Sequence, residues 1–208
     1  MLTRRISLAL LFLFACCAAF AQQPAVTLQG APRDVLIGEE FKFCVVFDNK
    51  NGAQEGFTAF VDLEFPAKGA DGPSPCDGIE FVKAAVISTT PPMPIQAIPV
   101  QAPCNNAPAF GFPHPLAPVP AVSIGGGNQF VTLPFEFGSF EPTQPDLIVE
   151  VTARVHKFAD NGQPLSVRAR AGFRYGSTAG GSGPAIVSPW TAPAVFTPRV
   201  IILHKELA

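Results

Sequence analysis

The sequence predicts an all-β fold, an immunoglobulin-like antiparallel β-sandwich, and three observations predict it. Several segments alternate apolar and polar residues with a period of two, which is typical of half-buried strands. Glycine and proline, 18 and 23 of the 208 residues, gather between these segments as turn formers. No window keeps a 3.6-residue period, so we expect essentially no helix. With 48% hydrophobic and 14% charged residues, the chain can bury a core instead of remaining disordered.

The clearest strand covers residues 40–48, where apolar odd positions alternate with even positions such as Lys42. A turn over residues 48–52 follows it, and residues 147–155 show the same alternation. We therefore expect one set of side chains to be buried: Phe41, Phe43, Val45, Phe47, Ile79, Phe81, Val149 and Val151. We expect three others, on the opposite parity, to be exposed: Lys42, Glu150 and Arg154.

Further strand candidates occur along the rest of the chain. Turn sequences such as Asp160-Asn161-Gly162 separate them, and the last long candidate carries Arg168, Arg170 and Arg174 on one parity. The candidates are residues 26–28, 35–37, 57–65, 79–86, 130–137 and 164–175. So many short strands at close spacing favour a sandwich over a mixed α/β fold.

Two segments interrupt this pattern. Residues 88–120 contain ten of the 23 prolines. Proline lacks the backbone donor that a central strand needs, so we interpret this segment as a long proline-rich surface insertion. Residues 175–184 are rich in glycine and serine and predict a flexible turn.

The N-terminus has the features of a secretory signal peptide over residues 1–21. Arg4 and Arg5 precede a short apolar run, and the small residues Ala19 and Ala21 form a cleavage site. The apolar run is too short to span a membrane, and no other segment is long and apolar enough to do so. We expect an exported protein, secreted, at the cell surface or in the periplasm. Lipid attachment at Cys16, in a sequence that resembles a lipoprotein cleavage box, is the alternative.

Cleavage after residue 21 leaves three cysteines, Cys44, Cys76 and Cys104. An odd number in an exported chain leaves at least one thiol unpaired or paired between chains. Cys76 and Cys104 both lie in turn-like sequences, and a disulfide between them is the preferred pairing. It would contribute about 3–4 kcal/mol in the chain-entropy model. The alternative is three reduced cysteines, and the sequence leaves the redox state of Cys44 open.

The residue types that carry chemistry show no recognisable arrangement. The net charge of −2 gives no reason to expect nucleic-acid binding. His114, His156 and His204 lack metal-ligand spacing, so we expect neither a metal nor another cofactor. The carboxylate pairs at 39–40 and at 62 and 64 could flank a glycosidase cleft, although a solvated strand face is the more common explanation. No nucleophile motif is present, and we expect no catalytic residues.

Two isolated side chains, Trp190 and Lys42, could each have a special role. Trp190 is the only tryptophan, and an aromatic residue beside a proline more often covers a strand edge or plugs a core. A groove lined by Phe110, Phe112 and Trp190 would instead indicate a carbohydrate- or peptide-binding module. Lys42 could in principle form an intramolecular isopeptide bond, but nothing else in the sequence supports one.

The order of the segments is similar to a bacterial conserved repeat, the domain of unknown function eleven. Residues 38–49 resemble its opening strand, and Asn49 and Gly52 occupy the positions of the Asn and Gly that close that strand. Residues 64–66 and 78–82 match its next two strands, and 135–142 with 147–155 match its later half. The resemblance covers roughly residues 30–175. It implies an immunoglobulin-like module of exported or surface-displayed bacterial proteins, often in tandem and without known catalysis.

These observations predict three parts of the chain and one role. A signal peptide over 1–21 precedes a sandwich domain over 22–190. Residues 191–208 are expected to be a linker with a candidate first strand of a following module; the alternative is that this strand closes the domain itself. The expected role is structural or adhesive at the bacterial cell surface, without catalysis, toward a protein or glycan partner and with further tandem repeats. The alternative is an extracellular module that binds carbohydrate or peptide.

Overall fold

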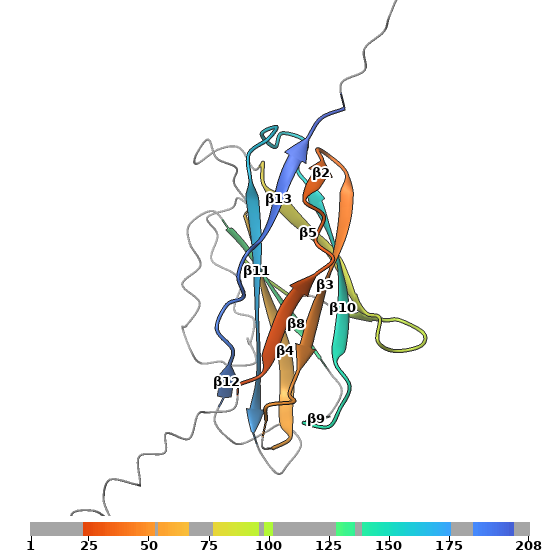
Figure 1. Cartoon of the computed structure of the whole chain (residues 1–208), viewed down its shortest axis with the longest axis vertical. Helices are drawn as coiled ribbons and strands as arrows, with labels where there is room; N and C mark the ends of the chain where they lie inside the picture. The colour runs from red at the N-terminus through yellow and green to blue at the C-terminus, as the bar shows by residue number, and fades with distance from the viewer. Residues whose placement is uncertain are drawn as a thin grey trace, which may run out of the picture.

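The protein is a sandwich of two β-sheets (Figure 1). The structure, a computed structural model, describes residues 23–52, 54–66, 77–95, 98–101, 128–135, 139–175 and 185–201. None of these residues is helical, so the all-β prediction is confirmed. The five-stranded sheet contains, in spatial order, β1 (Ala25–Gln29), β3 (Glu40–Asp48), β10 (Leu147–Val155), β5 (Ile79–Val86) and β6 (Met93–Ile95).

The second sheet has eight strands and is mixed at one edge. Its pairs are antiparallel except for β13 with β2, which run parallel. Its main path is β2 (Asp34–Leu36), β13 (Ala194–Arg199), β11 (Leu165–Tyr175), β4 (Gly56–Pro66), β8 (Asn128–Pro134) and β7 (Ile98–Gln101). Two short strands lie off this path, β12 (Ala185–Val187) beside β11 and β9 (Ser139–Phe140) beside β4.

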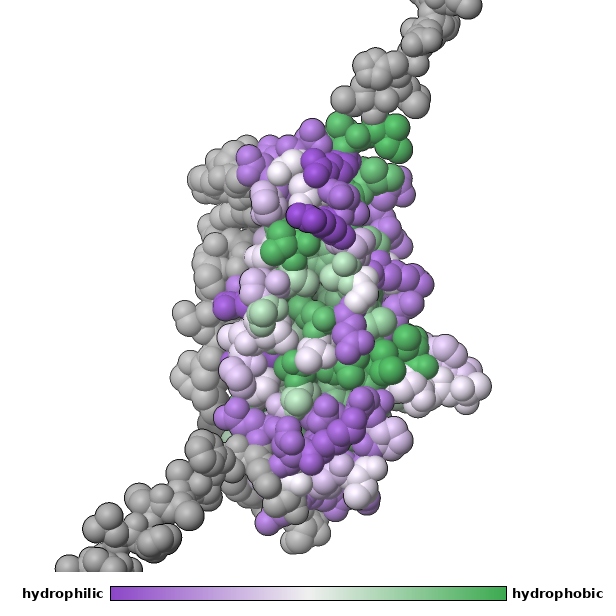
Figure 2. Space-filling view, viewed as in Figure 1, coloured by the Kyte–Doolittle hydropathy of each residue, from purple (hydrophilic) through white to green (hydrophobic). Residues whose placement is uncertain are grey.

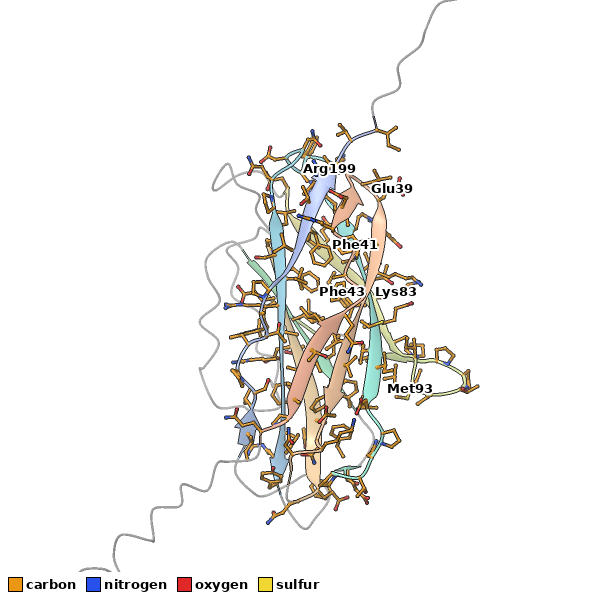
Figure 3. The ribbon with its side chains drawn as sticks, in the orientation of Figure 1. Glu39, Phe41, Phe43, Lys83, Met93 and Arg199 are labelled. Atoms are coloured by element: carbon orange, nitrogen blue, oxygen red, sulfur yellow. The ribbon has the colours of Figure 1, made fainter. Side chains whose placement is uncertain are left out.

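The core lies between the sheets and is built by the alternation seen in the sequence. Phe41 and Phe43 of β3 point into the space between the sheets (Figure 3). They pack with Phe196 of β13, whose ring centroid lies 4.8 Å from that of Phe41 and 5.8 Å from that of Phe43. Seven of the eight residues expected inside are buried: Phe41, Phe43, Val45, Phe47, Ile79, Val149 and Val151. Lys42 and Arg154 are exposed as expected, and Glu150 is half-exposed.

The prediction that Phe81 is fully buried was wrong. Its side chain is only partly buried and packs against the edge of the core, 6.1 Å from the ring of Phe65. The register between β5 and β10 shifts at this point: Lys83 pairs with Thr152, whereas Phe81 pairs with Ala153. Such a bulge inserts one extra residue and reverses the parity of the strand beyond it.

The proline-rich segment is not only a loop. Its described part contains β6 and β7, which pair at the edges of opposite sheets. Each of these strands pairs on one side only, so Pro94 and Pro99 need no donor toward a second neighbour. The expected insertion over 88–120 therefore contributes two edge strands, and its residues 102–120 lie outside the described part of the chain.

The assignment of residues 191–208 to a linker was wrong for residues 194–199. This segment is β13, which pairs with both β11 and β2 in the sheet of this domain. Phe196 at its centre is fully buried in the core. Pro198 suggested a linker, but it lies where β13 meets β2 at the edge of the sheet. The sandwich therefore extends past residue 190.

Several expectations fall on residues that the structure does not describe. They are the signal peptide over 1–21 with Cys16, both cysteines of the predicted Cys76–Cys104 disulfide, and the aromatic residues Phe110 and Phe112. Cys44 is a free, half-buried thiol. Within the described ranges, no helix is long and apolar enough to cross a membrane.

Candidate functional site

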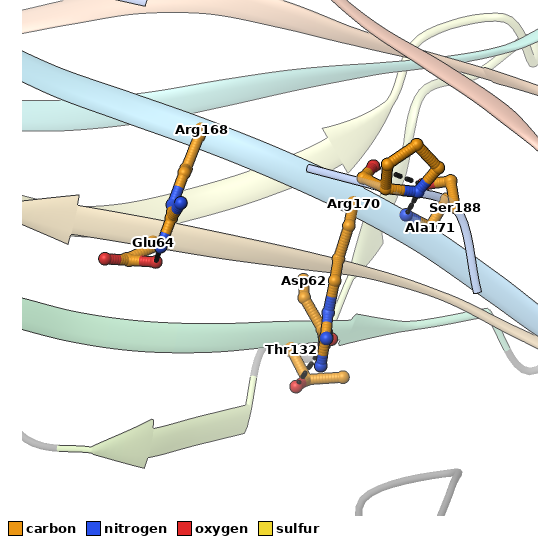
Figure 4. Close-up of polar contacts among 8 residues, drawn as sticks. Asp62, Glu64, Thr132, Arg168, Arg170, Ala171 and Ser188 are labelled. Atoms are coloured by element: carbon orange, nitrogen blue, oxygen red, sulfur yellow. Dashed lines mark hydrogen bonds and ion pairs between the residues drawn. The ribbon is translucent and has the colours of Figure 1, made fainter. Parts of the chain in front are cut away.

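The polar side chains of the eight-stranded sheet form a ladder on its outer face (Figure 4). Strand register places Arg168 opposite Glu64, and Arg170 opposite Asp62. Arg168 binds Glu64 through Nε and Nη2, which lie 2.8 and 2.6 Å from the same carboxylate oxygen, Oε2. Arg170 Nε donates to Asp62 Oδ2 over 2.8 Å. The arginine parity noted in the sequence thus aligns two guanidinium groups with two carboxylates.

Burial differs sharply along this ladder. The Asp62 side chain is 0% exposed and that of Arg170 13%, whereas the Arg168 side chain is 41% exposed. The buried Thr132 hydroxyl donates a further hydrogen bond to Asp62 Oδ1 over 2.8 Å. A buried pair is costly to break, since removing one partner leaves an uncompensated charge. Asp62 and Arg170 therefore join β4, β8 and β11, and Arg168 is the member that solvent reaches.

Residues 188–191 run beside β11 and fix the position of Trp190. Ser188 donates its backbone N–H to the carbonyl of Ala171, and its hydroxyl accepts the N–H of the same residue. Thr191 makes the same two bonds with Ala169. These bonds extend the sheet by one irregular strand and hold the indole against the outer face.

Trp190 lies over both arginines of the ladder. The Cζ atoms of Arg168 and Arg170 are 4.7 and 4.9 Å from the indole ring centre, within the range of cation–π contacts. The ring of Phe130 meets the indole edge-on with centroids 6.1 Å apart. The indole is half-buried and packs over these side chains on the face of the sheet.

A cavity opens next to the exposed end of the ladder. It has a volume of about 290 Å³ and is lined by Glu64, Pro66, Ser166, Arg168, Thr191 and Pro193. Small-molecule sites usually occupy roughly 300–1,000 Å³, so this cavity is at the lower end of that range. It combines a carboxylate, a guanidinium, two hydroxyls and two proline rings.

The outer face of the five-stranded sheet has another character. Lys42 binds Glu150 over 2.7 Å, but its side chain is 59% exposed, which gives an isopeptide bond no dry environment. Val46 of β3 lies opposite Ile148 of β10, and Ile87, just after the end of β5, donates its N–H to the carbonyl of Ile148; all three are half-buried or exposed. Figure 2 shows hydrophobic surface at the height of the projecting β5–β6 hairpin, where Met93 is 40% exposed.

Cys44 lies on the same outer face as Val46. Its pKa is raised above the usual thiol value, chiefly because burial disfavours the thiolate and secondly because Glu150 is negatively charged. A raised pKa lowers the thiolate fraction at neutral pH and with it the reactivity. These features are those of a structural cysteine.

A larger cavity of about 630 Å³ lies at one end of the sandwich. Its polar groups come from three strands and a turn, and are largely paired: Arg154 binds Glu40 over 2.6 Å, and His156 Nε2 lies 3.8 Å from Glu80 Oε1. Glu39 and Glu40 both line this cavity, and Glu40 is the one that pairs with Arg154. In the described part of the chain, no group of three His, Cys, Asp or Glu residues could hold a metal ion.

The structure thus brings the acidic residues of β4 into contact with the arginines of β11, which are distant in the sequence. Asp62 and Glu64 pair with the arginines of β11, and of the two only Glu64 lines the adjacent cavity. The arginine parity was visible in the sequence, but the contact with Trp190 was not, because it depends on how residues 188–191 dock beside β11. The sequence does contain one signal of the ladder. Arginines alternate along one strand and acidic residues alternate along another, so the two sets can face each other if the strands pair.

No protein-family model matches the chain, and no curated protein matches it. Among solved structures, AvmM, which catalyses macrocyclization in alchivemycin A biosynthesis, is 13% identical with a TM-score of 0.48, covering 90% of this chain and 93% of that one. A cohesin module from a Clostridium perfringens family 33 glycoside hydrolase is 12% identical with a TM-score of 0.45, covering 86% and 99%. BcpA, the major pilin subunit of Bacillus cereus, is 10% identical with a TM-score of 0.40, covering 85% and 40%. These scores carry no argument about function.

Proposed function

We propose that the chain is an exported, non-catalytic immunoglobulin-like module with a structural or adhesive role at the bacterial cell surface. The observation that carries the proposal is the pairing of the groups that catalysis would need. Asp62 and Glu64 are each held by an arginine of the neighbouring strand, and Glu40 is held by Arg154. A general acid or base must reach its substrate within hydrogen-bonding distance. Carboxylate oxygens that already accept hydrogen bonds from arginine are less available to a substrate, which suits a structural role.

We also propose distant membership of the domain of unknown function eleven. The pair that closes the first long strand in the resemblance is structurally coupled in this chain. The side-chain amide of Asn49, which is buried, donates to the carbonyls of Gln54 and Phe140, and Gly52 donates its N–H to the Asn49 carbonyl. A Cβ atom at Gly52 would collide with the Asn49 side chain. This coupling gives a physical reason for an Asn and a Gly at this spacing.

A second candidate function is the binding of carbohydrate or peptide. The observation in its favour is the cavity beside Arg168, because it places hydrogen-bonding groups next to proline rings at the surface. The two proposals concern the same module. In the second, one defined site for carbohydrate or peptide is responsible for binding; the first requires no such site.

Export is tested by expressing the full chain in a bacterial host and measuring the intact mass of the mature form. The proposal predicts cleavage before Gln22 and recovery outside the cytoplasm. A mature chain that starts at Cys16 with added lipid mass would indicate a lipid-anchored export product. Recovery of the uncleaved chain in the cytoplasm would overturn the proposal.

Adhesion is tested with the purified mature protein. We expect fluorescently labelled protein to be retained on washed bacterial cells in a saturable manner, as measured by flow cytometry. Excess unlabelled protein should compete with it. Retention that neither saturates nor competes would exclude a specific adhesive role.

A further inference from the structure

The cavity at the exposed end of the arginine ladder has a composition that selects one class of ligand. We infer that it is a binding subsite for a neutral carbohydrate, with Arg168, Ser166 and Thr191 as the polar contacts. This inference rests on the proposed adhesive role and names the ligand class for it.

The charge balance of the cavity argues against an ionic ligand. Its charged lining residues are Glu64 and Arg168, and they neutralise each other through contacts of 2.6 and 2.8 Å. An anionic ligand at the guanidinium would lie next to the negative charge of Glu64, and a cationic ligand at Glu64 would lie next to the positive charge of Arg168. A neutral ligand with many hydroxyls meets donors and acceptors without disturbing the pair.

Hydrogen-bonding capacity remains on the arginine side of the cavity. Arg168 uses Nε and Nη2 toward Glu64 and the flat face of its guanidinium toward Trp190. Its Nη1 group has no hydrogen-bond partner among the described residues, and the side chain is 41% exposed. Because an arginine carries five N–H donors in a fixed plane, the free edge offers a prealigned pair of donors.

The rest of the lining fits the remaining surface of a sugar ring. The exposed Ser166 hydroxyl can exchange hydrogen bonds with a ligand hydroxyl. The Thr191 hydroxyl accepts the N–H of Ala169 and can still donate its own hydrogen to a ligand oxygen. Pro66 and Pro193 present rigid apolar rings to the C–H face of a sugar. Binding pockets for small ligands combine apolar walls with a few placed polar groups in this way.

The site is also preorganised. Trp190 lies over the guanidinium of Arg168, and the backbone bonds of Thr191 to Ala169 hold this part of the wall on β11. A side chain that is already fixed loses little entropy when a ligand binds. Trp190 therefore acts as a positioning residue, and as the only tryptophan of the chain it reports on the site.

The test uses the mature protein on an array of neutral and acidic oligosaccharides, and then isothermal titration with the neutral oligosaccharide that gives the strongest signal. We expect neutral glycans to bind and to change the fluorescence of Trp190. Ser166→Tyr should fill the cavity and abolish binding without touching the ion pair. Thr27→Tyr, at an exposed hydroxyl position on the other sheet, should bind like the native protein.

Arg168→Met provides a second variant, and it should weaken binding at least tenfold while its melting curve shows that the domain is folded. Acidic glycans as the only ligands, no glycan binding at all, or unchanged affinity in Ser166→Tyr would overturn the inference. If cells retain the Ser166→Tyr variant as well as the native protein, the subsite fails and the adhesive role stands. If glycans bind at this cavity but cells retain nothing, the subsite stands and the adhesive role fails.

Discussion

The outer faces of the two sheets use the same cross-strand geometry to different effect. On the eight-stranded sheet, the Asp62 and Arg170 side chains are 0% and 13% exposed. On the five-stranded sheet, the Lys42 and Glu150 side chains pair at nearly the same distance and are 59% and 33% exposed. The difference teaches that a distance alone does not measure the importance of an ion pair. Solvent screens the second pair, whereas the first depends on its partners for compensation.

The largest effect should come from breaking the buried pair. Arg170→Met removes the arginine that pairs with the fully buried Asp62 carboxylate, and we expect a loss of about 3–5 kcal/mol in the free energy of unfolding. Urea denaturation followed by circular dichroism measures this loss. Lys42→Met on the other sheet is the matched control. A loss below 1 kcal/mol for Arg170→Met would mean that the buried pair contributes no more to stability than the exposed Lys42–Glu150 pair.

Removing Trp190 should have an intermediate effect on stability. The Trp190→Ala variant loses the stacking on Arg168 and Arg170, which is worth about 1–2 kcal/mol in a partly desolvated setting. The same denaturation experiment measures it. Trp190→Phe keeps an aromatic face and should recover part of the loss. If Ala and Phe are equivalent at this position, the stacking does not contribute.

The exposed pair should contribute little. We expect Lys42→Met to change the free energy of unfolding by at most about 1 kcal/mol. Any such difference from the native protein should shrink further as salt is added, because salt screens exposed charges. Unfolding curves at low and high ionic strength test this. A large effect that persists in high salt would mean that this face is not solvated as the structure shows.

The smallest effect concerns Cys44 on the same exposed face. Its raised pKa means that stability gained from the neutral thiol is present below the ordinary thiol pKa and is lost as pH rises through the folded-state value. Alkylation with iodoacetamide, located by peptide mass, should therefore be slow at neutral pH and accelerate in alkaline buffer. Glu150→Gln removes a negative charge and should move this acceleration to lower pH. An unchanged profile in that variant would leave burial as the whole cause.

Much of the fold could be predicted from local alternation. The strands β3 and β10 are predictable because apolar and polar residues alternate along them, and this alternation also predicts which of their residues are buried. Phe81 was misplaced because a single-residue bulge has no signal in the sequence. The strand β13 was assigned to a linker because Pro193 before it and Pro198 within it suggest one. The burial of Phe196 depends instead on partners more than a hundred positions away.

The candidate site was predictable in its parts and not in its assembly. Alternating Arg168 and Arg170 predicted one polar face of β11, and the acids at 62 and 64 were noticed as a pair. Their register across the two strands, and the docking of Trp190 over them, follow from tertiary pairing that no local pattern encodes. The cavity arises from the same docking, since Thr191 and Pro193 line it.

The most direct test of the difference between the two faces is a pair of double-mutant cycles in the same buffer. One cycle combines Asp62→Leu with Arg170→Met, and the other combines Glu150→Leu with Lys42→Met. The account predicts a coupling free energy of about 3 kcal/mol or more for the buried pair and less than about 1 kcal/mol for the exposed pair. Equal coupling energies in the two cycles, or a larger one on the five-stranded sheet, would contradict it.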